Sequence, residues 1–233
     1  MLQREKHEEK MSKILFDLAR HPVLSPLLGF KGGTACYFLY GLPRFSTDLD
    51  FTLTKELGGE EIYAPILEIL KRHGQIKESY EKRWTFFFLL SYEKTSHNIK
   101  IEISKRGYPN DRFKLEQYLG IPLLVMEKPL MAAHKLVAIT DRSKMMGRDL
   151  FDAHFFLKNE WPIDAATVEY RTDQKLPSYL RGLAEMLKKK PPKHILDGIG
   201  ELIDEKQKVW TKAHLLEELL FFLELRAKSA RFE

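Results

Sequence analysis

Residues 31–51 read KGGTACYFLYGLPRFSTDLDF, and this stretch decides the fold class. Two adjacent glycines, Gly32 and Gly33, stand near its start, and fourteen residues separate Gly33 from the first of two aspartates, Asp48 and Asp50. If the aspartates belong to a strand, side chains two residues apart point to the same face. The two carboxylates would then lie together on one face, while their apolar neighbours point into a core.

The carboxylate pair and the glycine pair suggest two halves of one binding site. Two carboxylates on one strand face repel each other unless a cation lies between them, and Mg²⁺ is bound by one or two carboxylates together with substrate phosphates. Without side chains, Gly32 and Gly33 let backbone N–H groups approach a phosphate at the start of a helix that Thr34 can cap. Either half alone also fits an ordinary turn or an edge strand, but the combination favours a site for a metal ion and a phosphorylated substrate.

The same pattern resembles the first motif of the nucleotidyltransferases of the DNA polymerase β superfamily. That motif is a glycine followed by Gly or Ser, a spacer, and two carboxylates separated by one residue. Within the superfamily, KGGTA and RFSTDLDF resemble the AbiEii/AbiGii-type toxin nucleotidyltransferases of bacterial abortive-infection and toxin–antitoxin systems. The resemblance covers about residues 28–158 and implies a nucleoside triphosphate as substrate, with Mg²⁺ or Mn²⁺ bound by the carboxylates.

A third carboxylate is expected on a neighbouring strand, because two-metal phosphoryl transfer usually needs one. In the segment NIKIEISKR, residues 98–106, three isoleucines alternate with Lys100, Glu102 and Ser104, which places the latter on one face. We therefore predict Glu102 as a catalytic carboxylate and metal ligand beside Asp48 and Asp50. An ordinary exposed strand glutamate is the alternative.

The segment MAAHKLVAITDRSKMMGRDLFDAHFFL, which follows later in the chain, also resembles the family. The family carries a lysine on a helix, then an arginine, then an Arg-Asp pair and a second aspartate, which correspond here to Lys135, Arg142, Arg148, Asp149 and Asp152. Lys135 and Arg142 are seven residues apart, so they would share one helical face and could both contact a triphosphate. The resemblance implies that Lys135 and at least one of the two aspartates act at the nucleotide site, although helix capping would also explain Asp149.

Two further groups of residues are candidates for contact with the substrate. Arg44 and Ser46 lie between the glycines and the aspartates and could contact a phosphate, while turn structure explains them nearly as well. The aromatic residues Trp84 and 86–88 are interpreted as a core strand rather than a platform for base stacking.

Hydrophobic periodicity predicts an α/β (α+β) fold, with a mixed sheet over residues 1–126 and a helical domain over residues 127–233. The resemblance implies that the first part is the nucleotidyltransferase core and that the helical domain completes the nucleotide site and binds the acceptor. In the first part we expect helices at 4–20, 34–41 and 59–74 and strands at 27–31, 47–53, 75–82, 83–93, 98–106 and 121–125. In the second part we expect helices at 127–142, 147–159, 176–190, 194–210 and 213–230, with a linker at 188–193.

Composition bounds the compartment and the partners. The chain has 233 residues, of which 44% are hydrophobic, and 38 basic against 33 acidic side chains; residues 71–114 alone carry eleven basic and five acidic ones. This excess is compatible with a polyanionic partner or with an ordinary soluble surface. A single cysteine, Cys36, a charged N-terminal segment and the lack of a long apolar run predict a cytoplasmic protein without a membrane span.

The residues and the resemblance together predict transfer of a nucleoside monophosphate to an acceptor hydroxyl. The expected acceptor is RNA, with the 3′ end of tRNA as the expected position, and a cognate antitoxin protein is the expected partner. A small-molecule acceptor such as an aminoglycoside would use the same metal site. A non-catalytic module that binds nucleotide or antitoxin is the alternative from another functional class.

Overall fold

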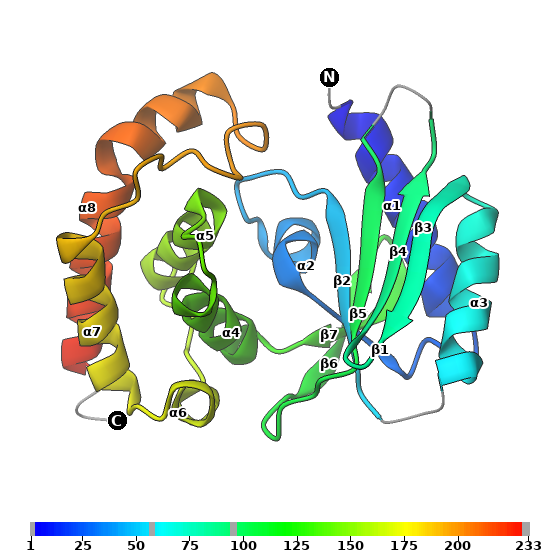
Figure 1. Cartoon of the computed structure of the whole chain (residues 1–233), viewed down its shortest axis with the longest axis horizontal. Helices are drawn as coiled ribbons and strands as arrows, with labels where there is room; N and C mark the ends of the chain where they lie inside the picture. Colours follow the sequence, from blue (N-terminus) through cyan, green and yellow to red (C-terminus); the bar gives the residue numbers. More distant parts are fainter. Residues whose placement is uncertain (1–2, 56–58, 94–96, 230–233) are drawn as a thin grey trace. The chain divides into compact units, whose positions relative to one another are not determined.

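The computed structural model describes residues 3–55, 59–93 and 97–229 (Figure 1). The chain divides into two compact units, Met1–Met126 and Glu127–Glu233. The first contains a mixed sheet with helices, and the second is helical. These features confirm the predicted α/β fold class, in which a mixed sheet is followed by helices. Across the described ranges, none of the helices has both the length and the hydrophobicity that crossing a bilayer requires.

Within the described part of the first unit, seven strands form one sheet in the order β3-β4-β5-β2-β1-β7-β6. The strands are β1 (Leu28–Lys31), β2 (Asp48–Leu53), β3 (Gln75–Lys82), β4 (Thr85–Ser91), β5 (Ile99–Ser104), β6 (Phe113–Tyr118) and β7 (Ile121–Met126). Strand β2 pairs in parallel with β5, and β1 pairs in parallel with β7, while the other neighbours are antiparallel. The helices are α1 (Arg4–Arg20), α2 (Gly32–Tyr40) and α3 (Gly59–Lys71).

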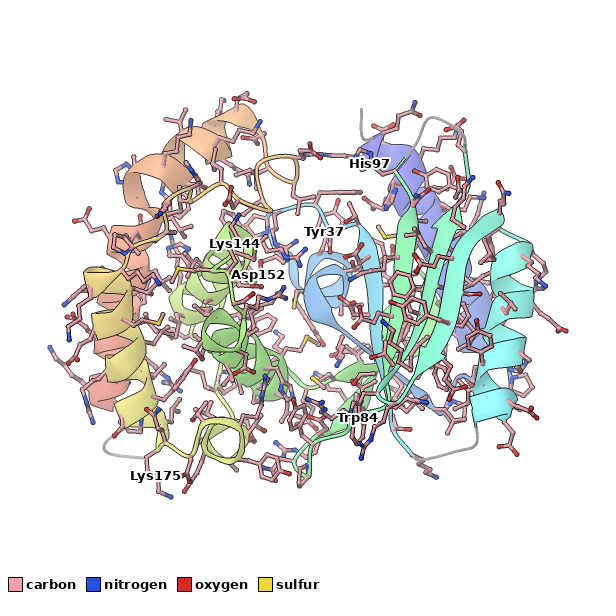
Figure 2. The ribbon with its side chains drawn as sticks, in the orientation of Figure 1. Tyr37, Trp84, His97, Lys144, Asp152 and Lys175 are labelled. Carbon is pink, nitrogen blue, oxygen red and sulfur yellow. The ribbon has the colours of Figure 1, made fainter. Side chains whose placement is uncertain are left out.

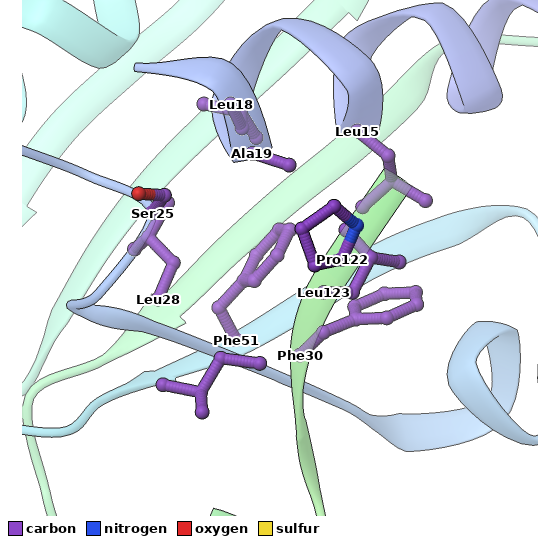
Figure 3. Close-up of a pocket in the computed structure, with 10 residues that line it drawn as sticks. Leu15, Leu18, Ala19, Ser25, Leu28, Phe30, Phe51, Pro122 and Leu123 are labelled. Atoms are coloured by element: carbon purple, nitrogen blue, oxygen red, sulfur yellow. The ribbon is translucent and has the colours of Figure 1, made fainter. Parts of the chain in front are cut away.

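The two faces of the sheet are covered by different helices. Figure 1 shows α1 and α3 on one side of the strands and α2 on the other. On the α1 side, Leu15 and Leu18 meet Phe30 and Phe51 around an apolar cavity of about 20 Å³ (Figure 3). A cavity of this size holds about one water molecule and no substrate. Asp50 alternates with Phe51, so its side chain points to the opposite face of the sheet, the side that α2 covers.

Strand β6 was missing from the sequence-based prediction. All of its residues are exposed or only partly buried, so it lacks the buried apolar face that makes a strand recognisable. It pairs with β7 through a two-residue turn in which Leu119 and Gly120 have φ of 49° and 81°. Positive φ at both central residues is typical of a type I′ hairpin.

His7 fastens α1 to the sheet from a fully buried position. Its Nε2 lies 3.0 Å from the backbone carbonyl of Thr47 and must carry the proton that it donates, while Nδ1 lies 2.9 Å from the Tyr92 hydroxyl and accepts from it. Burial lowers the pKa of His7 from 6.5, although the Thr47 carbonyl opposes this shift. The histidine is therefore held neutral, and its contact is with Thr47, the residue before Asp48.

This lowered pKa predicts loss of stability in mild acid. As pH falls below 6.5, the unfolded chain takes up a proton on His7 that the folded protein does not, so stability drops by up to about 1.4 kcal/mol per pH unit. We expect a His7→Gln variant to be less stable near pH 7.5 but to lose less stability between pH 6.5 and pH 5. Urea unfolding across this range measures it. Burial also lowers the pKa of His154, which is present in both proteins, so only the difference in stability between the native protein and His7→Gln reports on His7. Parallel curves of stability against pH for the two proteins would contradict the assignment.

The second unit consists of helices connected by short segments. Its described helices are α4 (Lys128–Asp141), α5 (Gly147–Lys158), α6 (Ala165–Thr172), α7 (Leu176–Lys189) and α8 (Glu205–Ser229). Helix α7 ends just before the two prolines of the predicted linker, as proline cannot continue a helix. Helix α8 packs against both α5 and α7.

Three expectations for this unit need correction. Helix α6 was not predicted, since its eight residues are too short for a periodic signal; Asp164 caps it by accepting a hydrogen bond of 2.7 Å from the Thr167 amide. The expected helix at 194–210 begins only at Glu205, and residues before it form turns that include Gly198 at φ 68°. From Glu205 onward the chain forms one helix of 25 residues instead of two.

Candidate active site

The parallel pairing of β2 with β5 assembles a row of charged side chains. Its register places Asp48 opposite Lys100 and Asp50 opposite Glu102. Residues directly opposite in neighbouring strands share one face, so the three carboxylates predicted from the sequence lie together. Lys100 Nζ lies 3.4 Å from both Asp48 Oδ2 and Glu102 Oε2. The structure thus adds one residue that was not predicted as part of the site, although its place in the alternating NIKIEISKR segment could have indicated it.

The charges in this row shift one another's protonation. Burial raises the pKa of Asp50, and the neighbouring Asp48 and Glu102 raise it further, against the opposing effect of Lys100 and Lys31. Burial alone would lower the pKa of Lys100, but the three carboxylates outweigh it, so the pKa of Lys100 is raised. The ammonium group therefore stays charged and provides the cation that adjacent carboxylates need.

The predicted metal site would be formed by the carboxylates of this row. In residues 3–55, 59–93 and 97–229, no group of three or more His, Cys, Asp and Glu side chains is arranged to hold a metal ion. The donor set of the row is nevertheless suitable, because carboxylate oxygens are hard ligands and Mg²⁺ needs only one or two of them when phosphates supply others. The chemistry of Asp48 and Asp50 therefore fits a magnesium ion that arrives with a nucleotide.

The glycine pair lies directly against this row. Gly32 has φ of 79°, and a Cβ atom there would lie 2.6 Å from Asp50 Oδ2. A Cβ on Gly33 would lie 2.6 Å from Arg44 Nη2 and 3.0 Å from Ser46 Oγ. Only glycines allow the backbone at the start of α2 to approach these polar groups so closely. The glycines, the aspartates and the Arg44–Ser46 segment are thus neighbours, although they are separated in sequence.

Thr34 joins α2 to β2 rather than capping the helix. The helix begins at Gly32 after Lys31, and no side chain caps it, which corrects the predicted capping role of Thr34. The fully buried Thr34 hydroxyl hydrogen-bonds the Ser46 hydroxyl at 2.8 Å and donates to the backbone carbonyl of Asp48. Arg44 is also buried, and its Nη1 donates to the Phe45 carbonyl at 2.9 Å. These contacts fix the position of the glycine turn relative to Asp48.

The two left-handed glycines at the ends of α2 provide a matched test of this close approach. Gly32 and Gly41 have φ of 79° and 69°, so alanine at either position costs about 1–2 kcal/mol of backbone strain. A Cβ on Gly41 meets nothing within 4 Å, whereas one on Gly32 displaces Asp50. We expect both variants to lose similar stability, but only Gly32→Ala to lose about a hundredfold in nucleotide transfer, measured with labelled nucleotide. Equal activities would show that the contact with Asp50 is unimportant.

The second unit contains a separate cluster of buried charges between α4 and α5. Lys135 Nζ lies 3.1 Å from Asp149 Oδ1 and 2.9 Å from Asp152 Oδ2, and Arg142 Nε lies 2.9 Å from Asp149 Oδ2. Both aspartate side chains are fully buried, whereas Lys135 is 17% exposed and Arg142 is 42% exposed. Asp152 is labelled in Figure 2. The cluster therefore consists of two cations that reach solvent and two carboxylates that do not.

This arrangement refines the predictions for these residues. Asp149 pairs with two cations, so ion pairing rather than helix capping accounts for its position in the first turn of α5. Arg142 is the residue after the end of α4, so the prediction that it shares a helical face with Lys135 is wrong. Arg148 makes no ion pair with a carboxylate in the described ranges and does not join the cluster.

Comparison with known proteins agrees with these features. A sequence-family model described as "Nucleotidyl transferase AbiEii toxin, Type IV TA system" matches residues 13–225. A crystal structure assigned as a nucleotidyltransferase from H. pylori is 23% identical, with a TM-score of 0.63, and the match covers 99% of this chain and 98% of that one. The crystal structure of JHP933 from Helicobacter pylori is also 23% identical, with a TM-score of 0.59 and the same coverage.

No curated protein matches the chain. At 23% identity the two solved structures show similarity of fold alone, and the family is shown by the sequence match over most of the length. That match includes the glycine pair, the carboxylate row and the buried charge cluster. The chain belongs to the AbiEii nucleotidyl transferase toxin family of type IV toxin–antitoxin systems.

Proposed function

We propose that the protein transfers a nucleoside monophosphate from a nucleoside triphosphate to a hydroxyl group of RNA, with the 3′ end of tRNA as the expected acceptor. The observation that carries this proposal is the contact between the glycine turn and the carboxylate row, in which the backbone of Gly32 lies against Asp50. A phosphate-binding backbone beside paired carboxylates is the arrangement that nucleotidyl transfer needs.

The carboxylates are proposed to bind the charged parts of the reaction. Asp48 and Asp50, with Glu102, would hold Mg²⁺ or Mn²⁺, which when bound neutralises phosphate charge and promotes ionisation of the acceptor hydroxyl. Glu102 is more accessible than Asp48, because its side chain is 42% exposed while that of Asp48 is 25% exposed. Of these two carboxylates, it is therefore better placed to meet an acceptor entering from solvent.

The remaining residues of the first unit position the nucleotide. Backbone N–H groups at Gly33 and Thr34 are proposed to donate to the triphosphate at the start of α2, where the helix dipole also favours an anion. Arg44 and Ser46 lie close to Gly33 of this turn, and the Ser46 hydroxyl hydrogen-bonds Thr34. The acceptor oxygen then forms a bond to the α-phosphorus, the bond between the α-phosphorus and the bridging oxygen to the β-phosphate breaks, pyrophosphate leaves, and the acceptor proton passes to solvent or to Glu102.

The second unit is proposed to contribute cations to the same reaction. Lys135 and Arg142 expose part of their side chains to solvent, and a triphosphate is the natural ligand for such a pair. Asp149 and Asp152 would act as positioning residues, since they are buried and touch the cations rather than solvent. Helical residues 127–233 are proposed to complete the nucleotide site and to help bind the acceptor.

An incorporation assay tests the proposal. The protein is incubated with total RNA, Mg²⁺ and each of the four nucleoside triphosphates in turn, labelled on the α-phosphate. We expect label to enter RNA with at least one nucleotide, and the activity to disappear with a chelator. Transfer to an aminoglycoside with none to RNA would replace the acceptor class, and absence of transfer to any acceptor would favour a non-catalytic module.

A protein antitoxin is the expected regulatory partner of a type IV toxin. We propose a cognate antitoxin as the partner of this chain, on the basis of its family. Co-expression with the gene adjacent to it on its chromosome, followed by growth measurement, tests whether the toxicity expected from RNA modification is relieved.

A further inference from the structure

The row of charged residues continues across the sheet into two aromatic residues. Glu102 of β5 lies opposite Phe87 of β4, and Phe87 lies opposite Tyr80 of β3. Asp50, Glu102, Phe87 and Tyr80 therefore occupy successive positions on the same face of four neighbouring strands. Phe87 lies directly beside Glu102, the carboxylate at the edge of the proposed active site that faces β4.

Phe87 differs from the aromatic residues on either side of it. Phe86 and Phe88 are fully buried under α3, where Tyr63 packs against both rings. Phe87 points to the opposite face and is only partly buried, as is Tyr80. The expectation that residues 86–88 belong together to the core is thus wrong for Phe87, because the alternation of a strand places it on the face that carries the carboxylates.

The rings of Phe87 and Tyr80 are stacked on each other. The ring centroids of Tyr80 and Phe87 are 4.7 Å apart with an interplanar angle of 7°, and Lys82 Nζ lies 4.5 Å from the centroid of the Tyr80 ring. Tyr80 thus covers one face of Phe87 and is itself backed by a cation. The other face of the Phe87 ring turns away from Tyr80, toward the strand that carries Glu102, and no described ring or cation packs on it.

The chemistry of transfer indicates which nucleotide reaches this ring. In an in-line displacement, the attacking oxygen and the leaving pyrophosphate lie on opposite sides of the α-phosphorus. The glycine turn that would hold the triphosphate lies on the β1 and α2 side of Asp50. Glu102 and Phe87 lie on the other side, so the acceptor approaches across them.

Charges at the end of the β3–β4 hairpin suit a nucleic-acid backbone. Trp84 is 45% exposed, and the guanidinium carbons of Arg83 and Arg106 lie 4.8 Å and 5.3 Å from its ring centroid. Figure 2 shows Trp84 at the end of these strands. In the part of the chain that the structure describes, neither arginine forms an ion pair with a carboxylate, so both guanidinium groups can bind phosphates.

We propose, on the basis of the proposed function, that the β3–β4 hairpin binds single-stranded RNA and that Phe87 stacks on the terminal base of the acceptor. Tyr80 and Lys82 hold the Phe87 ring in place, and Arg83 and Arg106 contact phosphates of the preceding nucleotides. Stacking on an aromatic ring tolerates every base, because each base has a π face. Phe87 thereby sets the position of the acceptor hydroxyl without selecting its sequence.

A fluorescence measurement tests the stack without catalysis. The probe is a short single-stranded RNA with 2-aminopurine as its 3′-terminal base, whose emission is quenched on stacking, titrated with the protein in the absence of nucleotide. We expect quenching with the native protein, affinity about tenfold weaker with Phe87→Leu, and recovery with Phe87→Trp. Phe16→Leu, the same substitution at a partly buried phenylalanine of α1 with Arg20 over its ring, serves as the matched control and should bind like the native protein. Quenching unchanged by Phe87→Leu would overturn the proposal, and thermal unfolding establishes that the variant is folded.

Steady-state kinetics separate this proposal from the function on which it rests. Phe87→Leu is expected to raise KM for RNA about tenfold and to leave KM for the nucleoside triphosphate within about twofold. The opposite pattern would show that the ring stacks on the incoming nucleotide and would overturn the assignment to the acceptor. If no variant transfers nucleotide at all, the proposed function fails, while the fluorescence result still decides whether RNA stacks on Phe87.

Discussion

An Asp48→Asn variant is expected to lose nucleotide transfer by about a thousandfold or more while retaining its fold. The substitution keeps the size of the side chain but removes the negative charge that would hold a divalent cation against the triphosphate. Metal ions contribute several kcal/mol of charge stabilisation in such reactions, and about 4 kcal/mol corresponds to about a thousandfold in rate. Initial rates of labelled-nucleotide incorporation into RNA, at saturating Mg²⁺, measure the loss.

The control for this experiment is Asp17→Asn. Asp17 lies on α1, on the far face of the sheet, with a side chain that is 31% exposed and paired with His73 and Arg72. It therefore matches Asp48, which is 25% exposed and paired with Lys100, in substitution, exposure and ion pairing. Asp17→Asn should transfer nucleotide at the native rate. A fully active Asp48→Asn protein would remove the proposed mechanism, because no other residue of the row can supply the same charge at this position.

A Lys135→Ala variant is expected to lower the free energy of unfolding by about 3–5 kcal/mol. Asp149 and Asp152 are both fully buried and both contact the ammonium group, so its removal takes a shared cation away from two carboxylates in the interior. Urea unfolding measures the loss.

Lys144→Ala is the control for the effect of removing a lysine from the same unit. Lys144 pairs with Asp197 at 2.9 Å, but its side chain is 70% exposed, so water replaces the lost partner and stability should change little. Lys135→Arg keeps the positive charge and should retain most of the stability. If Lys135→Ala were no less stable than Lys144→Ala, the buried cluster could not be holding α4 and α5 together, and its role as a support for exposed cations would be wrong.

Much of the proposed site could be predicted from local sequence patterns. The spacing of Gly32, Gly33, Asp48 and Asp50 is contained in one short segment, and the alternation around Glu102 placed that carboxylate on a polar face. Both patterns depend only on the geometry of a turn and a strand. In the structure, Asp48, Asp50 and Glu102 lie on one face of the sheet, and Gly32 at the start of α2 lies against Asp50.

Other features depend on contacts that no local pattern contains. Lys100 lies between Asp48 and Glu102 only because β2 pairs with β5 in one particular register. The sequence could not show that Phe87 is less buried than Phe86 and Phe88, because this depends on which face of the sheet α3 covers. For the same reason the sequence could not show that Lys135 contacts both Asp149 and Asp152, since this depends on how α4 packs against α5.

The parallel pairing of β2 with β5 has a consequence for when the protein can act. Between these strands the chain forms α3, β3 and β4, so a nascent chain that has not yet been translated past Ser104 has both aspartates but lacks their partner strand. A fragment released within this interval would contain Asp48 and Asp50 without Glu102 and Lys100, so the row of charged side chains can form only after β5 has been synthesised.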